Sequence, residues 1–71
     1  MTDSQKLRGL IRQKGLKYGF VARELGISPH SLAQKMDNRT QFRAGEIGGI
    51  SKLLRLTPEE RDAIFFAADV E

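Results

Sequence analysis

The stretch ARELGISPHSLAQKM, residues 22–36, decides how the middle of this chain folds. Helical spacing of apolar residues precedes Gly26 and resumes after Pro29. Glycine suits the left-handed conformation that ends many helices. Ser28 followed by Pro29 is a typical N-cap and first helical residue, since proline lacks only an N–H group that would be unpaired there. The stretch therefore predicts two helices joined by a very short turn.

Two helices joined in this way form either a hairpin within a core or a helix-turn-helix, which presents its second helix to a partner. A helix-turn-helix needs a small residue where its helices touch, which Ala22 supplies, and a turn residue that accepts positive φ, which Gly26 supplies. It also needs apolar anchors around the turn, and the chain has Val21, Leu25, Ile27 and Leu32. The combination favours a helix-turn-helix, although any three-helix core shows part of it.

The rest of the chain predicts three more helices and no extended sheet, because its β-branched and aromatic residues do not alternate. The predicted helices cover residues 4–14, 18–25, 29–36, 43 or 44 to 54, and 58–68. Asp3 or Ser4 is the expected cap of the first, and Thr57 with Glu60 forms a capping box at the start of the last. Gly48 and the next glycine in the fourth helix either permit a close neighbour or are simply tolerated. With 71 residues, we expect one all-α domain, a compact five-helix bundle.

Composition excludes several classes of function. The chain has no cysteine for a disulfide or thiolate site, and its single histidine, His30, cannot hold zinc alone. No apolar run approaches the ~20 residues of a membrane span, and no signal-peptide pattern opens the chain. No glycine-rich phosphate loop or paired acid and base suggests an enzyme. We expect a cytoplasmic, non-catalytic protein with no metal or cofactor.

Charge is divided unevenly along the chain. Residues 1–43 hold nine Lys or Arg and three Asp or Glu, net +6, whereas residues 44–71 hold three and six, net −3. Such a division either fits a polyanionic partner on one side or is an ordinary solvated surface. Other support is needed to choose between these two interpretations.

That support comes from a resemblance. The segments FVARELGISPHSLAQKM (residues 20–36) and FRAGEIGGISKLLRLTPEERDAIFF (residues 42–66) resemble the Cro/C1 (Xre) type of helix-turn-helix proteins of phages and mobile elements. The resemblance covers residues 5–66. It implies a lambda-repressor-like five-helix domain that binds double-stranded DNA sequence-specifically and regulates transcription, commonly as a dimer on a palindromic operator.

The resemblance also implies a recognition helix at residues 28–36, lying in the major groove. The residues it places toward base edges are Pro29, His30, Ser31, Gln34 and Lys35. The residues it places toward phosphates are Lys17, Tyr18, Arg39 and Arg43. Tyr18 stands where the family often has a glutamine, and its hydroxyl can still bond a phosphate. Gln34 is the strongest base-reading candidate, because its amide can bond adenine N6 and N7 together. His30 and Ser31 meet either phosphates or base edges, and Lys35 reaches a guanine or a phosphate.

Adjacent phenylalanines near the end of the chain raise the question of assembly. Phe65 and Phe66 cannot both turn fully inward from one helix, so we expect one in the core with Leu32, Met36 and Phe42. The other either packs under the first helix or supports a weak homodimer through the C-terminal helix. Two alternatives to a regulator stay open: a helical protein-interaction module, and a recombination accessory factor that bends DNA.

Overall fold

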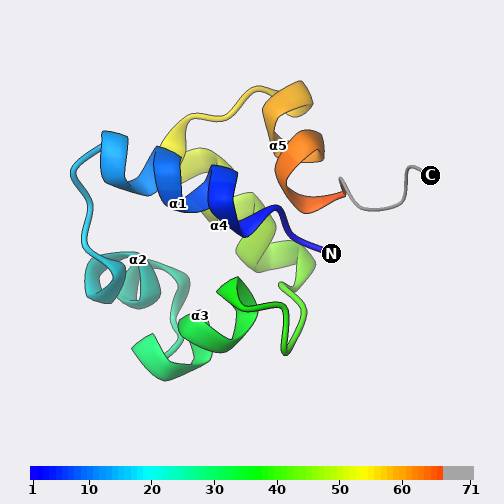
Figure 1. The fold of residues 1–71 in the computed structure, drawn as a ribbon. Coiled ribbons are helices and arrows are strands. Elements are labelled where there is room, and N and C mark those ends of the chain that lie inside the picture. The colour runs from blue at the N-terminus through cyan, green and yellow to red at the C-terminus, as the bar shows by residue number, and fades with distance from the viewer. Residues whose placement is uncertain (67–71) are drawn as a thin grey trace.

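A computed structural model describes residues 1–66, within which the chain forms five α-helices and no strand (Figure 1). They are α1 (Ser4–Gln13), α2 (Tyr18–Leu25), α3 (Pro29–Met36), α4 (Ala44–Leu54) and α5 (Pro58–Phe65). The all-α prediction is confirmed, and the helix bounds agree with it to within a residue except at the last helix. That helix was expected to reach residue 68, but it ends at Phe65, and Phe66 is its C-cap; residues 67 and 68 lie outside the described residues. None of the five helices has the length and apolar character needed to cross a membrane.

Local hydrogen bonds explain where the helices begin and end. The Asp3 side chain accepts the N–H of Lys6 and so caps α1, while Ser28 accepts the N–H of Ser31 at the start of α3. At α5, Thr57 accepts from the N–H of Glu60 at 3.1 Å and Glu60 accepts from the N–H of Thr57 at 2.8 Å. These pairs satisfy N–H groups that a helix leaves without partners.

The turn between α2 and α3 consists of Gly26, Ile27 and Ser28. Gly26 has φ +73°, a conformation that costs glycine little and other residues more. Its N–H group bonds the carbonyl of Arg23, and the N–H of Ile27 bonds the carbonyl of Ala22. The turn therefore closes α2 tightly before α3 starts in a new direction.

All five helices contribute to one core, whose side chains are less than a tenth exposed. Its members are Leu7, Ile11, Val21, Ala22, Leu32, Met36, Phe42, Ile50, Leu54, Ile64 and Phe65. The rings of Phe42 and Phe65 meet edge to face with centroids 5.3 Å apart. Phe66, by contrast, is 55% exposed. The prediction that one phenylalanine of the pair is core is confirmed.

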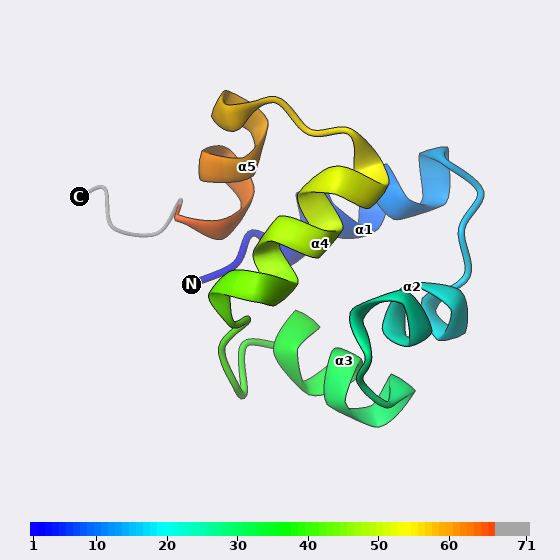
Figure 2. The ribbon, with the colours of Figure 1, turned by 180° about the vertical axis from the view of Figure 1, so that it is seen from behind.

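The helices are arranged so that α3 lies at an end of the bundle. Both Figure 1 and Figure 2 show α1 and α5 at one end, α3 at the other and α4 between them. Helix α2 packs against α3 and α4, while α5 packs against α1 and α4. The outer side of α3 is therefore not covered by α1 or α5.

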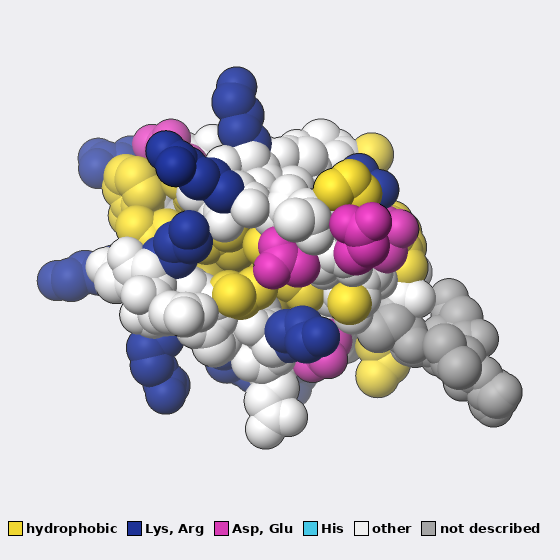
Figure 3. Space-filling view, turned by 90° about the horizontal axis from the view of Figure 1, so that it is seen from above, with side chains coloured by type: hydrophobic (Ala, Val, Ile, Leu, Met, Phe, Trp, Pro, Cys, Tyr) yellow, Lys and Arg dark blue, Asp and Glu magenta, His cyan; other side chains and the backbone are white. Residues whose placement is uncertain are grey.

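Acidic side chains lie at the end of the bundle opposite α3. On the face in Figure 3, which looks down on α1 and α5, acidic side chains lie toward the α5 side, and Lys and Arg side chains are spread over much of the same face. This agrees with the acidic first turn of α5, where Glu59 and Glu60 favour the positive helix end. The acidic first turn of α5 thus lies away from α3.

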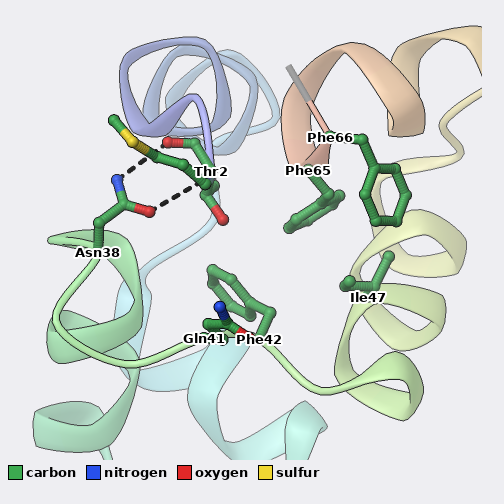
Figure 4. A pocket seen from close by; sticks show the side chains of 8 residues that line it. Thr2, Asn38, Gln41, Phe42, Ile47, Phe65 and Phe66 are labelled. Atoms are coloured by element: carbon green, nitrogen blue, oxygen red, sulfur yellow. Dashed lines mark hydrogen bonds between the residues drawn. The ribbon is translucent and has the colours of Figure 1, made fainter. Parts of the chain in front are cut away.

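The N-terminal segment ties α3 to α5. The N–H of Thr2 donates to Oδ1 of Asn38 at 2.8 Å, and Nδ2 of Asn38 donates to the carbonyl of Thr2 at 3.0 Å (Figure 4). Asn38 lies two residues beyond the end of α3 and has φ +62°, which asparagine tolerates better than most residues. The next N–H, of Asp3, donates to the carbonyl of Ile64 at 2.6 Å. Thr2 and Asp3 therefore connect the ends of two helices.

The two neighbouring glycines of α4 have different surroundings. A Cβ atom on Gly49 would lie 2.9 Å from Cδ2 of Leu25, whereas one on Gly48 would meet no atom within 4 Å. Gly49 therefore permits the close approach of α2 to α4, and Gly48 is tolerated. The sequence left these two explanations open, and each applies to one glycine.

This difference predicts the stability of two matched variants. Gly48→Ala should raise the free energy of unfolding by about 0.5–1 kcal/mol, because alanine restricts the unfolded chain and adds no clash. Gly49→Ala should gain less or lose stability, because the side chain of Leu25 must move. Urea denaturation of both variants measures the difference. Equal gains would contradict the close α2–α4 contact.

Candidate nucleic-acid interface

The exposed face of α3 follows from helix geometry. Residues 30, 33, 34 and 37 are spaced so that they share one side of a helix. His30 and Ala33 are exposed, and Gln34 is partly exposed. Pro29 is exposed at the first turn, and Ser31 is partly exposed beside it. Four of the five residues predicted to contact base edges are thus wholly or partly exposed to solvent at this end of the bundle.

Lys35 does not lie on that face. It shares the inner side of α3 with Leu32 and Met36, and the whole residue is only 7% exposed. Its Nζ lies 3.1 Å from Oε1 of Glu46 and donates to the carbonyl of Gln41 at 3.2 Å. An ammonium held in this way is directed into the protein, so we do not retain Lys35 among the base-contacting candidates.

Glu46 joins this buried ammonium to the start of α4. Its Oε1 also accepts the N–H of Arg43 at 2.9 Å, which caps the helix in the absence of an acceptor on the arginine side chain. Burial raises the pKa of Glu46, but the N–H of Arg43 and the ammonium of Lys35 lower it more, so the pKa lies below its ordinary value. Glu46 is therefore ionised at neutral pH.

The residues predicted to contact phosphates come from two places. Lys17 and Tyr18 begin α2, and both are exposed. No side chain caps this helix, so its first N–H groups have no side-chain acceptor. Arg39 and Arg43 are exposed in the loop of residues 37–43. In Figures 1 and 2, α3 lies between α2 and this loop.

Two residues on the face of α3 were not predicted from the sequence. Ala33 is exposed between His30 and Gln34, and its methyl group leaves room for close approach of a partner. The spacing of α3 places it at the edge of the buried side, so the sequence alone did not show its exposure. Asp37 brings a negative charge to the end of the face, but Arg8 pairs with it at 3.1 Å. The pair is mostly solvent-exposed and adds little stability, yet it offsets a charge that would repel a polyanion.

A shallow hollow of about 190 Å³ lies behind the loop rather than on the face of α3 (Figure 4). Thr2 and Asn38 lie on one side of it, and Phe42, Phe65 and Phe66 on the other. The hollow has one polar and one apolar wall and carries no charged side chain, so it does not extend the basic surface.

Comparison with known proteins identifies no relative. No family model, curated protein or solved structure matches this chain. The function must therefore be argued from the residues and their geometry.

The lowered pKa of Glu46 predicts an effect of acid. Its ionised form adds stability that is complete above the ordinary carboxyl pKa of the unfolded chain and is lost as pH falls through the lower folded value. Glu46→Gln should be less stable at neutral pH by about 1–3 kcal/mol, because the charged hydrogen bonds weaken. It should then lose less stability than the wild type on acidification to about pH 3.

Urea denaturation at both pH values tests this expectation. Glu24→Gln, which removes an exposed carboxylate of α2, is the control and should retain the acid sensitivity of the wild type. Identical acid sensitivity in Glu46→Gln and Glu24→Gln would contradict a special contribution of Glu46.

Proposed function

We propose that this protein binds double-stranded DNA sequence-specifically and regulates transcription, with α2 and α3 acting as a helix-turn-helix. One observation carries the proposal. The exposed face of α3 carries uncharged or small side chains, polar at His30, Ser31 and Gln34 and apolar at Pro29 and Ala33. The exposed cationic residues Lys17, Arg39 and Arg43 come from the segments on both sides of it. A helix that enters the major groove needs such a face, and the flanking cations can meet the two phosphate strands.

The chemistry of the face suits base recognition. Gln34 can bond N6 and N7 of adenine with its amide, a contact worth about 1–3 kcal/mol of discrimination. Ser31 and His30 can each donate or accept at a base edge or a phosphate. Pro29 and Ala33 are apolar, and small apolar groups pack against the methyl group of thymine.

Phosphate contacts would fix the orientation of the helix. The guanidinium groups of Arg39 and Arg43 bind phosphate oxygens well, and Lys17 with the hydroxyl of Tyr18 can do so at the start of α2. The net charge of +6 over residues 1–43 favours approach of a polyanion, and the acidic start of α5 lies away from it. The resemblance to Cro/C1-type proteins supports a regulatory role on phage or mobile-element DNA.

A homodimer would complete the recognition of a DNA site. One recognition helix covers only a few base pairs, too little information for a single site in a genome. Phe65 is buried against Phe42, so pairing of two copies falls to the exposed Phe66. Ala44, Ile47 and Gly48 of α4 border a groove beside it. Two copies related by a two-fold axis would place half-sites about 34–36 Å apart.

Selection of bound sequences from a random DNA pool tests the proposed function. We expect a palindromic consensus, whose affinity ratio over random DNA survives added salt. A consensus without effect on transcription from a linked promoter would favour a recombination accessory factor. A pool without enrichment would contradict DNA recognition and favour the protein-interaction module.

Two variants separate base recognition from phosphate binding. Gln34→Ala should relax preference at one base position and leave the salt dependence unchanged. Arg43→Ala should weaken binding to all sequences about equally and reduce the salt slope by about one unit. Lys52→Ala removes a charge from the last turn of α4 and is the control for net charge. Identical behaviour of the two test variants would contradict this division of roles.

The proposed pairing surface is tested with Phe66→Gln. On a selected operator we expect two chains per full site in the wild type, bound cooperatively, and loss of cooperativity in the variant because its apolar contact is removed. Phe20→Gln changes an exposed phenylalanine of α2 and should bind with unchanged cooperativity. One chain per full site would exclude the dimer, whereas cooperative binding by Phe66→Gln would exclude this surface.

A further inference from the structure

The buried pair of Lys35 and Glu46 connects three parts of the chain at one point. Lys35 projects from α3, and its Nζ contacts both Oε1 of Glu46 in α4 and the carbonyl of Gln41 in the loop. The same carboxylate oxygen accepts the N–H of Arg43 at the end of that loop. The side chains of Lys35 and Glu46 are 9% and 12% exposed, so solvent barely weakens these bonds.

The loop held in this way carries two of the cations assigned to phosphates. Arg39 is exposed near its start, and Arg43 is exposed at its end. Gln34, the main base-reading candidate, directly precedes Lys35 in α3. Any displacement of the loop relative to α3 would therefore change the distance between the base-reading side chain and the phosphate-binding side chains.

We propose that Lys35 and Glu46 are positioning residues that hold the phosphate-binding loop in fixed register with the base-reading face of α3. This inference rests on the proposed function. Neither side chain touches DNA in this arrangement. Their effect passes through Gln34, Arg39 and Arg43, because phosphate contacts set orientation and base contacts set sequence preference.

An apolar contact would hold α3 against α4 without fixing the loop. Apolar burial has no direction, whereas the ammonium of Lys35 has donors aimed at two particular acceptors. Replacing a buried ion pair with uncharged residues of similar volume often leaves stability unchanged or higher. The pair therefore contributes chiefly to geometry, and a variant can remove it without unfolding the protein.

The double variant Lys35→Met/Glu46→Gln is the sharpest test. It removes one charge of each sign, so the net charge stays at +3. Methionine keeps an unbranched buried side chain only one atom shorter than lysine, and glutamine can still accept the N–H of Arg43. We expect about tenfold weaker binding to the selected site, unchanged affinity for random DNA and an unchanged salt slope. In the free protein, amide hydrogen exchange of residues 39–43 should speed up about tenfold relative to α1 and α5.

Three outcomes would overturn the proposal. Unchanged preference for the selected site would show that the pair does not set the register. Equal loss on selected and random DNA, with a salt slope lower by about one unit, would show that Lys35 itself contacts a phosphate. Unchanged exchange in the loop would show that the pair does not hold it. A wild-type protein that selects no sequence would instead overturn the proposed function, which separates the two failures.

A second variant serves if the double variant does not fold. Glu46→Asp keeps every charge but withdraws the carboxylate by one methylene group, so both of its hydrogen bonds must lengthen. It should lower the preference for the selected site in the same direction and by a smaller factor. Full preference in a folded Glu46→Asp protein, with wild-type exchange in residues 39–43, would overturn the positioning role.

Discussion

Burial of the inner side of α3 is the constraint on which the candidate interface depends. Leu32 and Met36 are each about 1% exposed, and together they fix the rotation of a helix that lies at the end of the bundle. Once these two side chains are inside, residues 30 and 34 must face outward, whatever their chemistry. The same rotation leaves Ala33 and Lys35 at opposite edges of the buried side, and the edge with Lys35 is covered by Glu46 and Gln41, so its charge needs a partner. The exposed face and the buried ion pair thus both depend on how the inner side of α3 is packed.

Local signals in the sequence were sufficient to predict the helices. Ser28 with Pro29, Thr57 with Glu60, and Gly26 each act within one turn of chain, and the structure has helix ends at all three places. The burial of Leu32, Met36 and Phe42 was likewise accessible from spacing. The same spacing leaves Ala33 at the edge of the buried side, so its exposure is seen only in the folded structure. The helix-turn-helix and its contacts with DNA stay predictions.

Contacts between distant parts of the chain could not be predicted. The spacing of Lys35 from Leu32 and Met36 places it only at the edge of the buried side, and nothing near it in sequence identifies Glu46 as its partner. That partner lies on another helix and is known only once the loop between them is folded. Gly49 is a similar case, because its need for a hydrogen in place of a side chain arises from Leu25, which belongs to α2. Sequence patterns indicate which side of a helix is buried, but not what it is buried against.

The segment of residues 1–3 gives the molecule a mechanical link between its two ends. It is bonded to Asn38 at the end of α3 and to Ile64 in the last turn of α5, next to the phenylalanines. If two copies of the protein pair through Phe66 as proposed, a shift of α5 would therefore be transmitted to the loop that follows α3 through the hydrogen bonds of this segment. Thermodynamic linkage then requires reciprocity: if pairing of two copies favours one placement of that loop, DNA that favours the same placement promotes pairing by the same factor. Binding partners at opposite ends of so small a domain would not act independently.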